Sequence, residues 1–370
     1  MKISKIFKVN EMRLEKQKYI NEFNLAKQMK KEVYLEDLVP SLQKTHIKLN
    51  LGFLNRLLQN ASKSNKPHRN QEFAKRIGCP VNKDKKSATT IYGWMMGYRT
   101  VSFSKLTKII NLSDYNWKDI ETNLISIKVG IRSGEISPIF PIRIDEKMGS
   151  IVGHILGDGS IGLRFHSLFY SNSNVELLKE FNKNMRNIVG IGPRIWVQEK
   201  SRFEEKTRWL KRVNNLNKIP KGHNVGLFYP KICSDILYAL FGIFAEGKNK
   251  KITPQIINLD KEFKKGLIRA FFDDEGSVRS DSHTVRFHQD NKKLLKQMII
   301  LLKSLGIEPQ KVRSYKKKNK LRYYFNITGF REYYRFYHSI GCTSSKKKKE
   351  FELLINKVKN SKQFKKKYAL

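Results

Sequence analysis

Two short segments that combine an acid with glycine and serine occur at matching places in the chain. Residues 151–160 end in Gly157-Asp158-Gly159-Ser160, and residues 268–277 end in Asp274-Glu275-Gly276-Ser277. Asp158 and Glu275 are 117 positions apart, and apolar residues recur at that offset: Leu178, Phe181, Met185 and Ile188 match Leu295, Met298, Leu302 and Leu305. This agreement indicates an internal repeat in which the two acids hold equivalent positions.

The pair of carboxylates could do chemistry if the fold brings Asp158 and Glu275 together. Each is predicted at the C-terminal end of a helix, where the helix dipole disfavours a negative charge by roughly 0.3–1 kcal/mol. Two such carboxylates repel each other unless a cation lies between them, and their hard oxygen atoms favour Mg²⁺ or a similar ion such as Mn²⁺. Such an ion can activate water and stabilise the charge on a phosphodiester. One segment alone would indicate only a turn after a helix, but the matched pair favours a metal site.

The helices that would position these acids have start signals and a face of small residues. Asp145 and Asp260 are predicted to cap the two helix N-termini. Gly153 and Gly157 are four residues apart, so they share one helix face and allow a second helix to approach closely. Ala270 is the matching small residue of the second helix. We therefore predict that the two helices pack side by side.

Each copy of the repeat continues with segments that resemble strands and helices. Residues 168–170 have a strand-like composition, residues 284–289 alternate, and residues 311–315 and 321–327 can form a hairpin. Each repeat therefore has the order helix, strands, helix, strands, helix. The predicted fold class is α+β, with two pseudo-symmetric repeats and antiparallel sheets.

The chain is predicted to fold as four parts: an all-helical N-terminal domain (residues 1–135), a first repeat (141–252), a second repeat (253–362) and a basic tail (363–370). Glycine and proline residues mark the boundary near residues 135–141. The first repeat is longer between residues 200 and 217, which we interpret as an insertion in its hairpin.

The N-terminal domain contains a region, residues 68–113, that resembles a helix-turn-helix of the repressor type. Helices are expected over residues 70–78, 89–99 and 104–110. Thr and Tyr side chains of the middle helix could meet base edges, and Arg99 could contact a phosphate. An ordinary helical bundle is the alternative interpretation.

The charge of the chain favours a nucleic acid as partner. Its 370 residues include 74 Lys and Arg against 33 Asp and Glu, a formal net charge of +41. A compact fold with this charge repels itself unless a polyanion binds it. A generally lysine-rich composition is the alternative. No apolar run is long enough for a membrane span or a signal peptide, and three scattered cysteines argue against a disulfide framework, so we expect an intracellular monomer without a membrane partner.

The paired motifs resemble those of the LAGLIDADG homing endonucleases in their single-chain, two-repeat form, over about residues 145–362. The resemblance implies an αββαββα unit per repeat, motif helices that form the interface, and antiparallel sheets that form a basic saddle on double-stranded DNA. It implies that Asp158 and Glu275 hold the metal ions, with further contacts from the backbone carbonyls of Gly157 and Asp274. It also implies hydrolysis of both strands of a long target.

The chain departs from the family pattern at several positions. Ala270 replaces the usual glycine, and Asp274 adds a charge at a position that is usually small. The family often carries a lysine near each metal site, but Asn172 and Gln289 follow the strands here, and Lys231 is only a weak candidate for that role.

Contacts with DNA are expected from the strands, through side chains that can neutralise phosphate or read base edges: Arg194, Gln198, Lys311, Arg313, Arg322 and Tyr324. The chain ends carry no His-Asn pair of the kind an intein needs, so a free-standing or intron-encoded protein is expected. An intron RNA maturase and a non-catalytic DNA-binding regulator are the alternatives. The presence of both acids favours a site-specific, metal-dependent DNA endonuclease over either of them.

Overall fold

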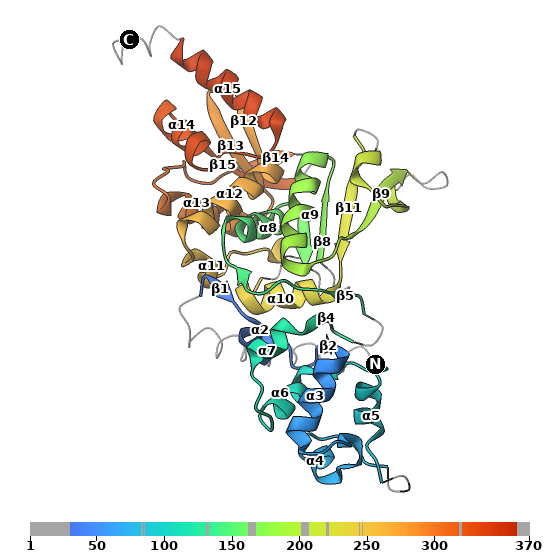
Figure 1. Cartoon of the computed structure of the whole chain (residues 1–370). Coiled ribbons are helices and arrows are strands. Elements are labelled where there is room, and N and C mark those ends of the chain that lie inside the picture. The colour runs from blue at the N-terminus through green and yellow to red at the C-terminus, as the bar shows by residue number, and fades with distance from the viewer. Residues whose placement is uncertain are drawn as a thin grey trace.

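The structure, a computed structural model, describes residues 30–82, 84, 86–130, 133–161, 168–200, 207–219, 222–243, 245, 247–317 and 320–360. Two mixed α/β repeats with antiparallel sheets follow a smaller N-terminal part (Figure 1). The predicted α+β class is therefore confirmed. The predicted basic tail, residues 363–370, lies outside the described residues.

The first repeat consists of α8 (Glu146–Leu156), β7 (Gly159–Ile161), β8 (Leu168–Asn172), α9 (Val175–Val189), β9 (Arg194–Lys200), β10 (Thr207–Val213), β11 (Val225–Tyr229) and α10 (Lys231–Phe241). Its sheet has the strand order β10-β9-β11-β8-β7, and every neighbouring pair is antiparallel. The edge strand β10 belongs to the segment that the sequence indicates as an insertion.

The second repeat consists of α12 (Lys261–Glu275), β12 (Gly276–Arg279), β13 (Thr284–Gln289), α13 (Lys292–Ser304), β14 (Arg313–Lys317), β15 (Lys320–Thr328), α14 (Phe330–Ser339) and α15 (Ser345–Lys359). Its sheet order is β12-β13-β15-β14, which equals that of the first repeat once β10 is set aside. The order α12-β12-β13-α13-β14-β15-α14 is the predicted αββαββα unit.

Helices α8 and α12 form the interface between the repeats, as the glycine spacing predicts (Figure 1). Asp145 and Asp260 cap them by accepting hydrogen bonds from the backbone N–H groups of Met148 (3.0 Å) and Phe263 (2.9 Å). A methyl group at Gly153 would overlap the carbonyl oxygen of Leu267. The missing side chain therefore lets the two backbones meet.

The N-terminal part contains short helices, a two-stranded sheet and a four-stranded sheet. Its elements are β1 (Glu32–Val33), α2 (Leu35–Leu38), β2 (His46–Leu49), α3 (Leu51–Ser62), α4 (Gln71–Arg76), α5 (Thr89–Met95), β3 (Val101–Ser102), α6 (Phe103–Ile110), α7 (Trp117–Thr122), β4 (Leu124–Lys128), β5 (Glu135–Ile136) and β6 (Ile142–Arg143). Four strands form an antiparallel sheet in the order β3-β2-β4-β5. The all-helical prediction is therefore wrong in this detail, because strands of two to five residues are too short for apolar periodicity to reveal.

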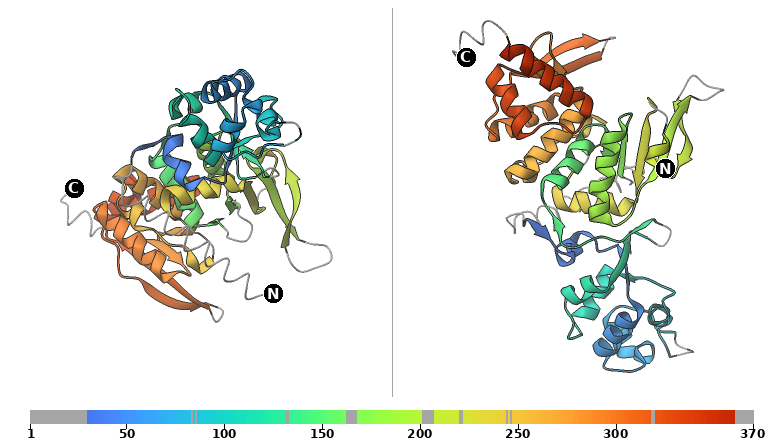
Figure 2. Two further views of the ribbon diagram at one scale, coloured as in Figure 1. Left: turned by 90° about the horizontal axis from the view of Figure 1, so that it is seen from below. Right: turned by 45° about the horizontal axis from the view of Figure 1, so that its top comes forward.

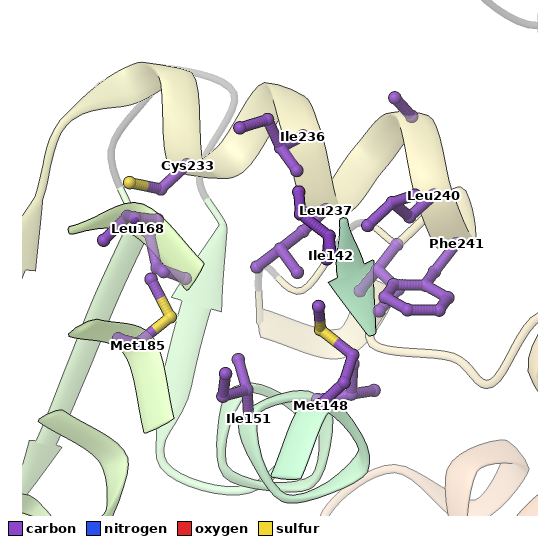
Figure 3. Packing of buried hydrophobic residues seen from close by; sticks show 14 of the residues in the cluster. Ile142, Met148, Ile151, Leu168, Met185, Cys233, Ile236, Leu237, Leu240 and Phe241 are labelled. Carbon is purple, nitrogen blue, oxygen red and sulfur yellow. The ribbon is translucent and has the colours of Figure 1, made fainter. Parts of the chain in front are cut away.

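Helix α10 joins the N-terminal part to the first repeat. Its apolar residues Ile236, Leu237 and Leu240 lie near Ile142 of β6 and Met148 of α8 (Figure 3). The N-terminal part lies at the opposite end of the molecule from the second repeat (Figure 2). The described residues include no helix that is long and apolar enough to span a membrane.

Substitution of Gly153 by alanine tests the close approach of α8 and α12. The added methyl group has no space against Leu267 and Ala270, and overpacking of this kind costs about 1–3 kcal/mol. We expect a melting temperature several degrees lower by calorimetry. Gly130→Ala is the control, because nothing lies within 4 Å of a methyl group there. Equal melting temperatures of the two variants would contradict the interface.

Candidate functional site

The acidic C-terminal ends of α8 and α12 lie together because the two helices are parallel. Gly149 faces Phe263 near the start of the helices, and Gly157 faces Asp274 at their end. The backbone N–H of Asp158 is 3.4 Å from a carboxylate oxygen of Asp274. The structure therefore brings Asp158 and Glu275 to one place, at the helix ends that the repeat matches.

Ionisation of both acids is opposed by their surroundings. The pKa of Asp158 is raised to about 8, first because the surrounding protein excludes water from its carboxylate and second because Asp274 and Glu275 are negatively charged. Burial and the charge of Asp274 raise the pKa of Glu275 to about 7. Asp158 still has an exposed surface, and Glu275 is half-buried. A cation that reaches these carboxylates would relieve their repulsion.

Each acid is held by an amide from the end of a strand in its own repeat. Asn172, the last residue of β8, donates a hydrogen bond from Nδ2 to Asp158 at 3.0 Å. Gln289, the last residue of β13, donates one to Glu275. Asn172 and Gln289 are 117 positions apart, the same offset that relates the acids. The two repeats thus present equivalent acid–amide pairs.

Two lysines contact the C-terminal ends of the motif helices. Lys250 Nζ donates a hydrogen bond to the carbonyl oxygen of Gly157, and Lys347 Nζ donates to those of Phe272 (2.7 Å) and Asp273 (2.6 Å). They supply positive charge where the helix dipoles are negative. Burial lowers the pKa of both lysines, although nearby carboxylates oppose that shift.

Lys250 is a functional candidate that sequence reasoning missed. It lies between α10 and α12, outside the paired segments from which the repeat was recognised. Lys231, the weak candidate, lies in α10 and its Nζ is 4.0 Å from an oxygen of Asp235. Three acids, Glu275, Asp158 and Asp274, act electrostatically on Lys250.

A divalent ion fits the carboxylates of Asp158 and Glu275 better than it fits the backbone carbonyl of Gly157. Asp158 and Glu275 offer the hard oxygen atoms that Mg²⁺ or Mn²⁺ requires. A cation between them would also relieve the repulsion between their negative charges. The Gly157 carbonyl already accepts a hydrogen bond from Lys250. Within the part of the chain that the structure describes, no three His, Cys, Asp or Glu residues form a complete metal cluster. Water or phosphate oxygen atoms would have to complete the coordination.

Comparison with known proteins finds a family similarity within the second repeat. Residues 262–341 match the sequence model of a family described as the LAGLIDADG-like domain. Most of the second repeat is therefore similar to this domain. This finding agrees with the resemblance that the paired acidic motifs indicate, and the matched region includes both Asp274 and Glu275.

The individual proteins that resemble the chain are distant from it in sequence. The DNA-directed RNA polymerase subunit Rpo1C of Methanocaldococcus jannaschii is 26% identical over 257 residues, which are 69% of this chain, and the chain spans only 26% of that subunit. The homing endonuclease I-DmoI in complex with DNA and Mn is 15% identical with a TM-score of 0.37, covering 54% of this chain and 98% of that chain. The N-terminal LAGLIDADG domain of DUF199/WhiA is 15% identical with a TM-score of 0.33, covering 54% and 83%.

The sheet of the first repeat presents predicted contact residues on its outer face. Ile195 and Val197 of β9 are buried. Arg194, the first residue of the strand, is exposed, and Gln198 is half-buried. Gln198 accepts a hydrogen bond from Asn224 Nδ2 (3.1 Å). This alternation places Arg194 and Gln198 on the face that points away from the core.

The sheet of the second repeat shows the same alternation. Phe325 and Ile327 of β15 are buried, and Arg322, Tyr324 and Asn326 lie on the other face. Arg313 pairs with Tyr324 across the strands and is exposed. Lys311, also exposed, precedes β14.

Three further contacts involve arginine side chains of this sheet. Arg322 forms an ion pair with Asp290 at 3.3 Å. Arg286 of β13, which sequence reasoning missed, stacks over the Tyr324 ring at 4.3 Å and donates a hydrogen bond to Asn326 at 2.9 Å. The strict alternation of residues 284–289 was a signal that could have found it.

The N-terminal part has a second candidate surface around α5. The connection between α4 and α5, residues 77–88, is longer than the three or four residues of a typical helix-turn-helix turn. The helix-turn-helix therefore stays a prediction. A cavity of about 890 Å³ lies beside the end of α5 and is lined in part by four cations: Lys48, Arg99, Lys105 and Lys128. Tyr98, at its edge, is 76% exposed.

Neutralising Asp158 should stabilise the metal-free protein at high pH. Because the pKa of Asp158 is raised in the folded state, the folded chain binds this proton more tightly than the unfolded chain does. The resulting contribution to stability is complete in acid and is lost as pH rises towards 8. We expect Asp158→Asn to raise the melting temperature in EDTA by an amount that grows from about pH 5 to about pH 8.

Asp281→Asn is the matched control, because Asp281 is exposed and its hydrogen bond with Arg279 lowers its pKa. It should bring no such gain. Added Mg²⁺ should stabilise the wild type at pH 8 and have less effect on Asp158→Asn. A gain that does not depend on pH would contradict the electrostatic origin of the effect.

Proposed function

We propose that the chain is a site-specific, metal-dependent endonuclease that cuts double-stranded DNA, a homing endonuclease in its activity. The observation that carries this proposal is the meeting of Asp158 and Glu275 at the ends of two parallel helices, beside Lys250. Support also comes from the match of residues 262–341 to the LAGLIDADG-like domain and from the net charge of +41.

Asp158 and Glu275 would hold one or more divalent ions, Mg²⁺ or Mn²⁺. Such an ion activates water and stabilises negative charge on a phosphodiester. Asn172 and Gln289 orient the carboxylates through their hydrogen bonds. Lys250 adds a positive charge beside the carboxylates, where it can stabilise charge on the phosphate.

The duplex would lie across the outer faces of the two sheets. Basic and aromatic side chains there suit phosphate contacts and base reading: Arg194, Arg286, Arg313 and Tyr324. The basic cavity beside α5 would extend the contact to DNA that flanks the target. A non-catalytic DNA-binding regulator and an RNA-binding maturase share this surface chemistry, but neither needs the paired acids.

Cleavage can be tested with a plasmid library that includes the sequences flanking the coding region, joined as an uninterrupted site. We expect the purified protein to linearise plasmids with its target when Mg²⁺ is present. Asp158→Asn and Glu275→Gln should each abolish double-strand cutting while leaving affinity for the same DNA unchanged, as measured by gel shift.

Glu308→Gln serves as the control, because Glu308 lies away from the acids and pairs with Lys303. It should cut as the wild type does. Binding without cutting by the wild type would favour a regulator, and preferred binding to intron RNA would favour a maturase. Undiminished cutting by both acid variants would refute the assignment of these residues.

The two proposed DNA surfaces can be tested through the salt dependence of binding. Arg313→Ala and Arg99→Ala should each lower the slope of log affinity against log salt concentration by about 0.9, the value for one phosphate contact. Lys303→Ala is the control, since Lys303 lies on α13 and pairs with Glu308 at 2.9 Å. An unchanged slope for Arg99→Ala would exclude the N-terminal surface from the complex.

A further inference from the structure

The side chain of Asp274 belongs to the second repeat but contacts the first. Its carboxylate is fully buried. Four groups of the first repeat surround it: Tyr170 Oη at 2.8 Å and Asn172 Nδ2 at 3.1 Å from Oδ1, and His154 Nδ1 at 3.0 Å and the backbone N of Asp158 at 3.4 Å from Oδ2. These groups come from α8, from β8 and from the residue that follows the C-cap of α8.

The equivalent position in the first repeat is Gly157, 117 residues earlier. A methyl group at Gly157 would lie 2.6 Å from Asp274 Oδ2. The absence of a side chain in one repeat therefore provides the space that the aspartate of the other repeat fills. The site has one such aspartate and one such glycine, so the repeats are not equivalent here.

The residues around Asp274 are also specific to the first repeat. At the offset of 117, His154 corresponds to Phe271 and Tyr170 corresponds to Phe287. The two phenylalanine rings are buried and stack on each other, with centroids 6.3 Å apart. Polar partners for a carboxylate thus exist on the Asp158 side, and an apolar pair takes their place on the Glu275 side.

We propose that Asp274 is a positioning residue for the Asp158 half of the site, acting across the repeat interface. The link is Asn172, whose Nδ2 lies within hydrogen-bond distance of both Asp274 (3.1 Å) and Asp158 (3.0 Å). Asp274 holds this amide, and the amide holds the carboxylate of Asp158. Although Asp274 is adjacent in sequence to Glu275, it serves the other acid. This inference rests on the proposed nuclease function.

Strand-specific cleavage can test the assignment, because Asn172 and Gln289 mark the two halves. On an asymmetric target with each strand labelled separately, Asn172→Ala and Gln289→Ala are expected to slow opposite strands under single-turnover conditions. Asp274→Ala should slow the same strand as Asn172→Ala, by roughly tenfold to a hundredfold, which is the range for loss of a residue that orients a metal ligand. The other strand should change much less.

A bias of Asp274→Ala towards the strand of Gln289→Ala, or equal slowing of both strands, would overturn the proposal. So would a failure of the two amide variants to separate the strands. Loss of His154, Tyr170 and Asn172 contacts can prevent folding of Asp274→Ala; Asp274→Asn, which keeps the shape and one acceptor oxygen, is then expected to show the same bias more weakly.

Crystal structures of the wild type and Asp274→Asn separate this proposal from the proposed function. The side chains of Asp158 and Asn172 should shift in the variant, while Glu275 and Gln289 keep their positions. This readout applies even if the wild type cuts no DNA, in which case the nuclease function fails alone. An unmoved Asp158 together with a moved Glu275, or no movement of either, would overturn the positioning role.

Discussion

The close parallel packing of α8 and α12 is the constraint on which the rest of the structure depends. Glycines at one-turn spacing on α8 remove the side chains that would keep the backbones apart, and Gly266 does the same on α12 against Glu146. Because the helices are parallel, their negatively polarised ends meet at one place. The two sheets, each connected to the end of its helix, are then fixed on either side of that place.

This packing carries an electrostatic cost that other parts of the chain offset. Carboxylates at helix C-termini face the negative end of the dipole, and here several of them gather. Lys250 and Lys347 contact the terminal carbonyl oxygens, and His154 lies between Asp274 (3.0 Å) and Glu180 (3.9 Å). Burial alone would lower the pKa of His154, but the two carboxylates outweigh it and raise the pKa to about 10.

Part of the positive charge lies on the outer faces of the two sheets, for example at Arg194, Arg286 and Arg313. In each sheet, alternate residues face the core and the outer surface, so the apolar core and the basic outer face come from the same strands. The N-terminal part adds a separate basic cavity around Arg99. Such an arrangement is consistent with a large net positive charge in a folded protein, because a bound nucleic acid would offset the repulsion.

The sequence by itself determined the repeat, both acids, both helix caps and the small-residue face, because each of these follows from local spacing or from a constant offset. It also predicted that Arg194, Arg313 and Tyr324 lie on or beside strands, but it left open which face of each sheet points outward. Only the tertiary structure decided that Lys250 reaches Gly157 and that Asp274 contacts the opposite repeat. Both depend on how distant segments pack, and the position equivalent to Asp274 in the first repeat is Gly157, which carries no acid. The short strands of the N-terminal sheet were missed because two to five residues show no periodicity that distinguishes them from a helix.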